Sequence, residues 1–195
     1  LVVNASNISK NWQWIVEKNN KFNCSISNLS DDISLLAIQG PKAELFCQNF
    51  SSDNLSELKN YSFIIGEFAG YEDIIISKTG YTGSGGYEIY IPNNKALKVW
   101  DELFSNKEYD LKPIGLAARD TLRIEMGYCL YGNDINEKTS PLEANLRWIT
   151  KVETNFIGSN IIKAEIQNGL KRKLIGFKLL EKSIPRNGYE IYSPE

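Results

Sequence analysis

The chain of 195 residues contains no histidine and only three cysteines. Without histidine, a histidine-containing zinc site and a Ser-His or Cys-His nucleophile are excluded. Cys24, Cys47 and Cys129 lie far apart and form no CxxC motif, which fits free thiols in a reducing compartment. We therefore expect a cytoplasmic protein without a metal centre.

The sequence also has little excess charge and no long hydrophobic run. Its formal net charge is -2, and a nucleic-acid-binding surface would need a basic excess. No apolar stretch approaches the roughly 20 residues that cross a bilayer. The hydrophobic content of 42% is ordinary for a globular protein and can form one good core or more than one small core. Neither nucleic acid nor a membrane is expected as a partner.

The order of predicted elements favours an antiparallel α+β architecture, because strands and helices do not alternate regularly. Residues 74–76 form a continuous apolar run, which predicts a strand buried on both faces. The predicted strands are 1–4, 22–26, 34–39, 62–69, 73–78, 87–91, 173–180 and 189–192, with a turn at Asn187 and Gly188. One predicted helix begins at a cap at Ser6 or Asn7, and four more cover 41–50, 94–104, 114–127 and 160–168. In the helix at 94–104, the residues expected to be buried are Leu97, Val99, Trp100, Leu103 and Phe104.

Residues 80–88, GYTGSGGYE, form a glycine-rich loop. A phosphate-binding loop leads from a strand into a helix and ends in Gly-Lys-Ser/Thr, whereas here a second strand should follow and lysine is missing. Tyr81 and Glu88 bracket the glycines and offer an aromatic face and a carboxylate to one ligand. Such a carboxylate can accept hydrogen bonds from an amino-pyrimidine edge. A mobile hairpin loop without a ligand is the alternative.

Residues 113–148 combine a short apolar helix with a loop rich in Tyr, Asn, Asp and Gly. Half-buried guanidinium groups need carboxylates or polar ligands as partners. The segment therefore predicts either a structural ion-pair cluster or a ligand site. The charged residues of the helix are Arg119, Asp120, Arg123 and Glu125.

The glycine-rich loop and several further motifs together resemble the aminomethyltransferases, the folate-dependent T proteins of the glycine cleavage system. GYTGSGGYEIYIP at 80–92 is similar to the family's Gly-Tyr-Thr-Gly-Glu-Asp-Gly-aromatic-Glu loop, although Ser84 and Gly85 stand where the family has two acids. The other motifs occur in the family's order: LVVNAS at 1–6, LLAIQGPKA at 35–43, GLAARDTLRIEMGYCLYGNDI at 115–135, FIG at 156–158 and RKLIGF at 172–177.

The resemblance implies transfer of a one-carbon unit from the aminomethyl-dihydrolipoyl arm of H protein to tetrahydrofolate, with release of ammonia. Tyr81 and Glu88 match residues that hold the pterin, and Arg119 matches an arginine of the folate site. Tyr128 matches a tyrosine that lines the same cavity, and Asn4 an asparagine close to the pterin. The family's key aspartate lies upstream of the Val-Asn-Ala strand, so we expect no principal catalytic residue in this chain.

The resemblance also implies interleaved domains around a folate channel. Residues 33–138 would form the first domain, and residues 1–32 with 139–170 the second. Residues 171–195 would be the opening hairpin of a C-terminal β-barrel. Because both ends of the sequence look cut, we expect a fragment of a longer protein.

Three other interpretations are open. The chain could be a non-catalytic folate-binding relative of the kind that assists iron-sulfur protein maturation, but those relatives carry Lys-Gly-Cys-Tyr-x-Gly-Gln-Glu where this chain reads NEKTSPLE at 136–143. It could be the folate half of a sarcosine or dimethylglycine dehydrogenase, whose full length would be far greater. It could also be a structural fragment that binds nothing.

Overall fold

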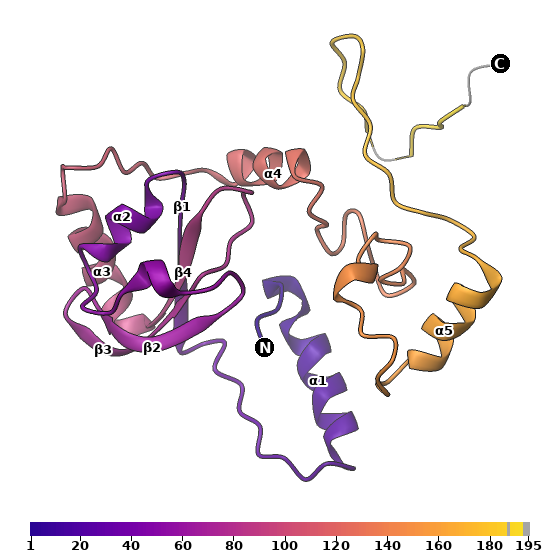
Figure 1. Ribbon diagram of the computed structural model, residues 1–195, viewed down its shortest axis with the longest axis horizontal. Coiled ribbons are helices and arrows are strands. Elements are labelled where there is room, and N and C mark those ends of the chain that lie inside the picture. The colour runs from indigo at the N-terminus through magenta and orange to yellow at the C-terminus, as the bar shows by residue number, and fades with distance from the viewer. Residues whose placement is uncertain (187, 193–195) are drawn as a thin grey trace. The chain divides into compact units, whose positions relative to one another are not determined.

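The computed structural model describes residues 1–186 and 188–192 and divides into two compact units, Leu1–Tyr128 and Cys129–Glu195. The first unit contains a sheet with helices, and the second contains one longer helix and many turns (Figure 1). Within the described ranges, no helix is both long and apolar enough to cross a membrane.

A four-stranded antiparallel sheet forms the centre of the first unit, in the order β1-β4-β3-β2. It confirms the predicted α+β class with an antiparallel sheet. The strands lie close to the predicted positions: β1 (Ile33–Gln39), β2 (Phe63–Phe68), β3 (Tyr71–Ser77) and β4 (Gly86–Pro92).

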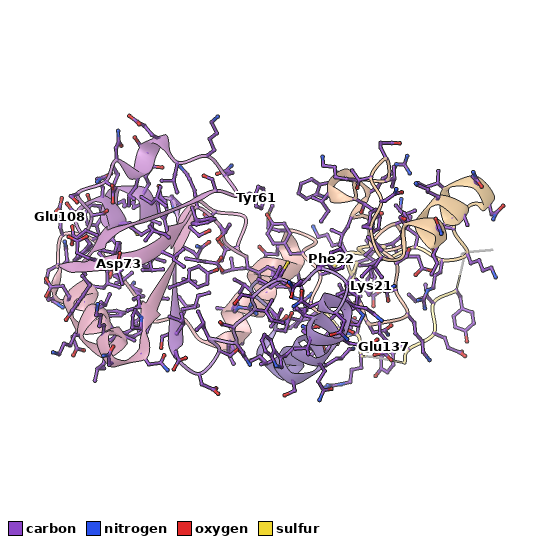
Figure 2. The ribbon with its side chains drawn as sticks, turned by 90° about the horizontal axis from the view of Figure 1, so that it is seen from below. Lys21, Phe22, Tyr61, Asp73, Glu108 and Glu137 are labelled. Atoms are coloured by element: carbon purple, nitrogen blue, oxygen red, sulfur yellow. The ribbon has the colours of Figure 1, made fainter. Side chains whose placement is uncertain are left out.

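The β2–β3 pair contains a bulge close to its turn. Gly66 pairs with Ile74 while Phe68 pairs with Tyr71, so β3 has one residue more than β2 between the two pairs. The backbone accommodates the extra residue at Asp73, which has a left-handed φ of 61° and is labelled in Figure 2. Such bulges bend an antiparallel pair and increase its twist.

Two helices, α2 (Ala43–Gln48) and α3 (Asn93–Ser105), pack on one face of the sheet (Figure 1). Both helices were predicted, but Leu97 and Trp100 are 71% and 41% exposed, so their predicted burial is wrong. Val99 and Leu103 are one turn apart and form the narrow stripe that faces the sheet, while Trp100 and Leu97 lie progressively further round the helix from it. The fully buried side chains of this core include Phe68, Ile74, Ile76, Tyr87, Ile89 and Ile91.

The opposite face of the sheet carries exposed apolar residues. Ile74 and Ile76 are fully buried, whereas Ile75 between them is 37% exposed. The prediction that both faces of this strand are buried is therefore wrong. Successive side chains of a strand point to opposite faces, and α2 and α3 cover only one of them. Other exposed apolar residues on this face are Ile65, which pairs with Ile75, and Phe63 on the same strand. Leu35 on β1 is also exposed and pairs with Tyr90, the partner of Ile75 on β4.

The first helix, α1 (Ile8–Asn19), follows a 3-10 turn at Ala5–Asn7 and confirms the predicted helix. Asn7 occupies the N-cap position but its side chain makes no capping bond. The strands predicted at 1–4 and 22–26 are not formed. The Asn19 side chain bonds both the N–H and the carbonyl of Cys24, at 3.2 and 2.7 Å. This local turn, which includes Phe22 (Figure 2), uses backbone groups that a sheet would need.

Two further predicted helices are confirmed: α4 (Leu116–Glu125) ends the first unit, and α5 (Ser159–Asn168) lies in the second, where it stops at Gly169 with φ 83°. The strand predicted at 173–180 is not formed. Instead Leu174 donates its N–H to the Glu143 carbonyl and accepts a bond from the Asn145 side chain, at 2.8 and 2.7 Å.

The chain end also differs from the predicted hairpin. The described residues 188–192 form no strand, and Asn187 of the predicted turn lies outside the described residues. The predicted start of a barrel is therefore not seen in the residues that the structure describes.

Candidate functional site

Three of the predicted site residues meet beside the glycine-rich loop. Tyr81 in this loop stacks on Tyr128, which follows α4, with ring centroids 5.7 Å apart and an interplanar angle of 21°. The guanidinium carbon of Arg119, on α4, lies 4.7 Å from the centroid of the Tyr81 ring. A cation over an aromatic face and a stacked aromatic pair are both attractive arrangements. The fold thus joins residues that are far apart in the sequence.

In this position Arg119 offers N–H donors to a ligand. The residue is exposed, and a guanidinium group carries five N–H donors. Such donors can form a bidentate pair with a carboxylate. The cluster therefore combines two aromatic rings with a cation that can bind an anionic group.

The ion pair of the helix is formed by Arg123, not by Arg119. Arg123 is only 3% exposed, and its Nε and Nη2 both lie 2.7 Å from Asp120 Oδ1. Its Nη1 donates to the Tyr128 carbonyl at 3.1 Å, and the Tyr128 N–H donates to the Arg123 carbonyl at 2.9 Å. Arg123 thus fixes the backbone that carries Tyr128. The three-residue spacing of Asp120 and Arg123 was the signal in the sequence for this pair.

Glu88 lies in β4 on the face away from the helices and is half-buried. Its carboxylate accepts a hydrogen bond from the Thr79 hydroxyl. Burial raises the pKa of Tyr90. The negative charge of Glu88 and the hydrogen bond that the Tyr90 hydroxyl donates to Glu88 raise this pKa further. A carboxylate has about four acceptor sites, so these two hydroxyl groups leave room for ligand donors.

The glycine-rich loop runs from β3 to β4, as predicted, and therefore lacks the strand-to-helix geometry of a phosphate loop. Gly83 adopts a left-handed φ of 72°, and a Cβ at this position would overlap the Met126 side chain. Met126 follows α4 directly. The loop and the end of α4 are therefore in close contact on the same side as the Tyr81–Tyr128 stack.

Asn4 is the remaining predicted site residue. It is exposed and precedes the 3-10 turn, where its carbonyl accepts a bond from the Asn7 N–H at 2.9 Å. The contacts that join Tyr81, Arg119 and Tyr128 do not involve it. Its role at the pterin stays a prediction.

Other features of the first unit lie apart from these residues. One open surface hollow is lined by residues between Glu44 and Ser56, and another by residues 49–52, 67, 69 and 70 with Glu102. Neither lining includes a predicted site residue. Across residues 1–186 and 188–192, no group of three acidic or cysteine side chains is arranged to hold a metal ion.

The sequence and the fold match a known class of protein. Residues 1–154 match the family described as the GCVT N-terminal domain, and the chain belongs to this family. It is homologous to glycine cleavage aminomethyltransferases over their N-terminal part.

Individual relatives agree with this assignment. An aminomethyltransferase of Flavobacterium psychrophilum is 55% identical over 192 residues, which are 98% of this chain and 53% of the relative. One from Bacteroides fragilis is 48% identical over 198 residues, covering 100% of this chain and 55% of the relative. A crystal structure of the glycine cleavage system aminomethyltransferase T from Bartonella henselae is 31% identical, with a TM-score of 0.74 over 85% of this chain and 45% of that one. The chain spans about half the length of the curated relatives it matches.

Proposed function

We propose that the full-length protein is a tetrahydrofolate-dependent aminomethyltransferase of glycine cleavage. It moves the one-carbon unit from the aminomethyl-dihydrolipoyl arm of a lipoylated H protein to tetrahydrofolate. The products are ammonia, the dihydrolipoyl arm and 5,10-methylene-tetrahydrofolate. The main support from this chain is the cluster of Tyr81, Tyr128 and Arg119 beside the glycine-rich loop, in a member of the GCVT N-terminal domain family.

The predicted site residues suit different parts of tetrahydrofolate. The pterin has a flat face, which favours stacking on tyrosine rings. Its amino-pyrimidine edge donates hydrogen bonds, which a carboxylate such as Glu88 accepts. The glutamate tail is anionic and pairs with a guanidinium such as Arg119. Asn4 completes the proposed set close to the pterin.

The domain organisation is part of the same proposal. Residues 33–138 form the first domain, residues 1–32 with 139–170 the second, and residues 171–195 open a C-terminal β-barrel in the full-length protein. The aspartate that positions the reacting folate nitrogen lies upstream of residue 1. The cytoplasmic location stays a prediction.

The substitution Glu88→Gln tests the site. It exchanges an acceptor-only carboxylate for a neutral amide, and hydrogen bonds to charged groups contribute about 1.5–3 kcal/mol each. The Kd for tetrahydrofolate of the full-length protein should therefore rise roughly ten- to a hundredfold, since 1.4 kcal/mol is tenfold. Isothermal titration calorimetry measures this change. Glu72→Gln, at an exposed residue of β3, is the matched control and should leave the Kd unchanged.

Two results would contradict the proposal. Unchanged affinity in Glu88→Gln would remove Glu88 from the folate site. A protein that binds tetrahydrofolate but releases no ammonia from aminomethylated H protein would be a non-catalytic relative instead of a transferase.

A further inference from the structure

The side-chain amide of Gln39 connects both ends of the glycine-rich loop. Gln39 is the last residue of β1 and pairs with Gly86 of β4. Its Nε2 donates to the carbonyls of Thr79 and Tyr87, at 3.1 and 3.3 Å, which lie 40 and 48 positions away in the sequence. Its Oε1 accepts a bond from the Thr82 hydroxyl at 3.3 Å. One side chain thus bonds the loop at its start, its middle and its end.

The glycines of the loop fit around this amide. A Cβ at Gly80 would overlap the Gln39 side chain, and a Cβ at Gly86 would overlap both that side chain and the Ile38 carbonyl. The Gly40 N–H, directly after Gln39, donates to the Gly85 carbonyl at 2.8 Å. The loop therefore wraps closely around Gln39, and glycine at Gly80 and Gly86 leaves the space for it.

Tyr81 lies between two residues that Gln39 touches, Gly80 and Thr82. Thr79, whose carbonyl accepts from Gln39, uses its hydroxyl to bond Glu88. We propose that Gln39 is a positioning residue for folate binding, which holds the loop so that Tyr81 and Glu88 keep the arrangement that the ligand needs. The inference rests on the proposed folate function.

Few side chains other than glutamine can form this set of hydrogen bonds. The site needs two donors for carbonyls and one acceptor for a hydroxyl, and an amide supplies both kinds. Gln39→Glu keeps the size and the acceptor but loses the donors, so two carbonyls face a carboxylate. Gln39→Leu loses every bond. Both changes should let the loop move away from its bound shape.

Gln48 offers a matched control. Its Nε2 donates to the carbonyls of Ser51 and Asp53, at 3.0 and 2.8 Å, and its Oε1 accepts from the Leu55 N–H at 2.9 Å. This amide thus organises a loop in the same way, but the loop carries no proposed folate residue. Gln48→Leu should lower stability by an amount similar to Gln39→Leu without affecting the ligand.

The experiment measures Tm and the Kd for tetrahydrofolate in the full-length protein and in the three variants. Displacing a binding group by about 1 Å can reduce function by a factor of about a hundred, so the Kd of Gln39→Leu and of Gln39→Glu should rise at least about tenfold. The Kd of Gln48→Leu should stay close to the unsubstituted value, although its Tm falls. If Gln39→Leu does not fold, Gln39→Glu provides the comparison.

Two outcomes overturn the inference while the proposed function stands. In the first, both Gln39 variants bind tetrahydrofolate as tightly as the unsubstituted protein, while Glu88→Gln binds weakly. In the second, Gln48→Leu loses as much affinity as Gln39→Leu, which would show a general effect of lowered stability. Absence of binding in the unsubstituted protein would instead refute the proposed function itself.

Discussion

Arg119 and Arg123 lie one helical turn apart on α4, and their exchange for alanine should have separable effects. Arg123 is buried against Asp120 and the Tyr128 backbone, so Arg123→Ala should lower the local stability of α4. Arg119 is exposed and lies over the Tyr81 ring, so Arg119→Ala should weaken folate binding with little change in stability.

The expected magnitudes follow from the contacts. Arg123→Ala loses hydrogen bonds to a carboxylate, which contribute about 1.5–3 kcal/mol, and one to a backbone carbonyl, which contributes about 1 kcal/mol. Asp120 is 46% exposed, so water rehydrates it after the change and the full penalty for an unpaired buried charge does not apply. We therefore expect a loss of about 2–3 kcal/mol. Arg119→Ala loses a cation–π contact at an exposed site, about 0.5–1 kcal/mol.

Native-state hydrogen exchange of the α4 amides reports this local stability without assuming that a protein of several domains unfolds in one step. A loss of 2–3 kcal/mol corresponds to exchange faster by roughly 30- to 150-fold, because 1.4 kcal/mol is tenfold. Lys112→Ala is the control, since its ion pair with Asp110 is exposed and precedes α4. If Arg119→Ala accelerates exchange as much as Arg123→Ala and keeps the folate affinity, the division of roles between the two arginines is wrong.

Two more predictions concern pH and the length of the chain. A hydrogen bond from Lys78 and the charge of this lysine hold the pKa of Glu44 below its ordinary value of 4.5. The ion pair therefore stabilises the fold above that pH, and its contribution is lost as the pH falls through the lowered pKa of Glu44. The Tm difference between the unsubstituted protein and Glu44→Gln should shrink in acid, and a constant difference would contradict this. The 195-residue chain alone should release no ammonia from aminomethylated H protein, because positioning by the upstream aspartate is missing; turnover within tenfold of the full-length protein, roughly 1.4 kcal/mol in barrier, would show that this aspartate is dispensable.

The sequence predicted the elements of the first unit well where periodicity and burial agree. The four strands of the sheet and the helices that cover it lie close to the predicted positions, because short apolar runs, alternation and helical spacing each reflect a face that is buried. The strands predicted at 22–26 and 173–180 failed for a different reason. The Asn19 side chain bonds Cys24 within the same turn, and the Asn145 side chain bonds Leu174 from 29 positions away. Both bonds take backbone groups of these segments, and the apolar pattern does not reveal such competition.

The sequence identified the residues of the candidate site more readily than the residues that hold them in place. Tyr81, Glu88 and Arg119 stand in motifs, so a resemblance identifies them, and their roles stay predictions. Gln39 and Arg123 act through hydrogen bonds to backbone carbonyls 5 to 48 positions away. Only the folded backbone shows which carbonyls come within reach of these side chains.

The pairing of β1 with β4 also determines when the glycine-rich loop can take shape during folding. The β2–β3 hairpin is local, whereas Gln39 meets Tyr87 only after a segment of 48 positions has closed. Closure of a long segment comes with an entropic penalty before its contacts form, which makes such pairings slow. A growing chain would complete the hairpin first, the loop only after β4 has emerged, and the Tyr81–Tyr128 stack later still. Tetrahydrofolate would then bind and stabilise the part of the unit that folds last.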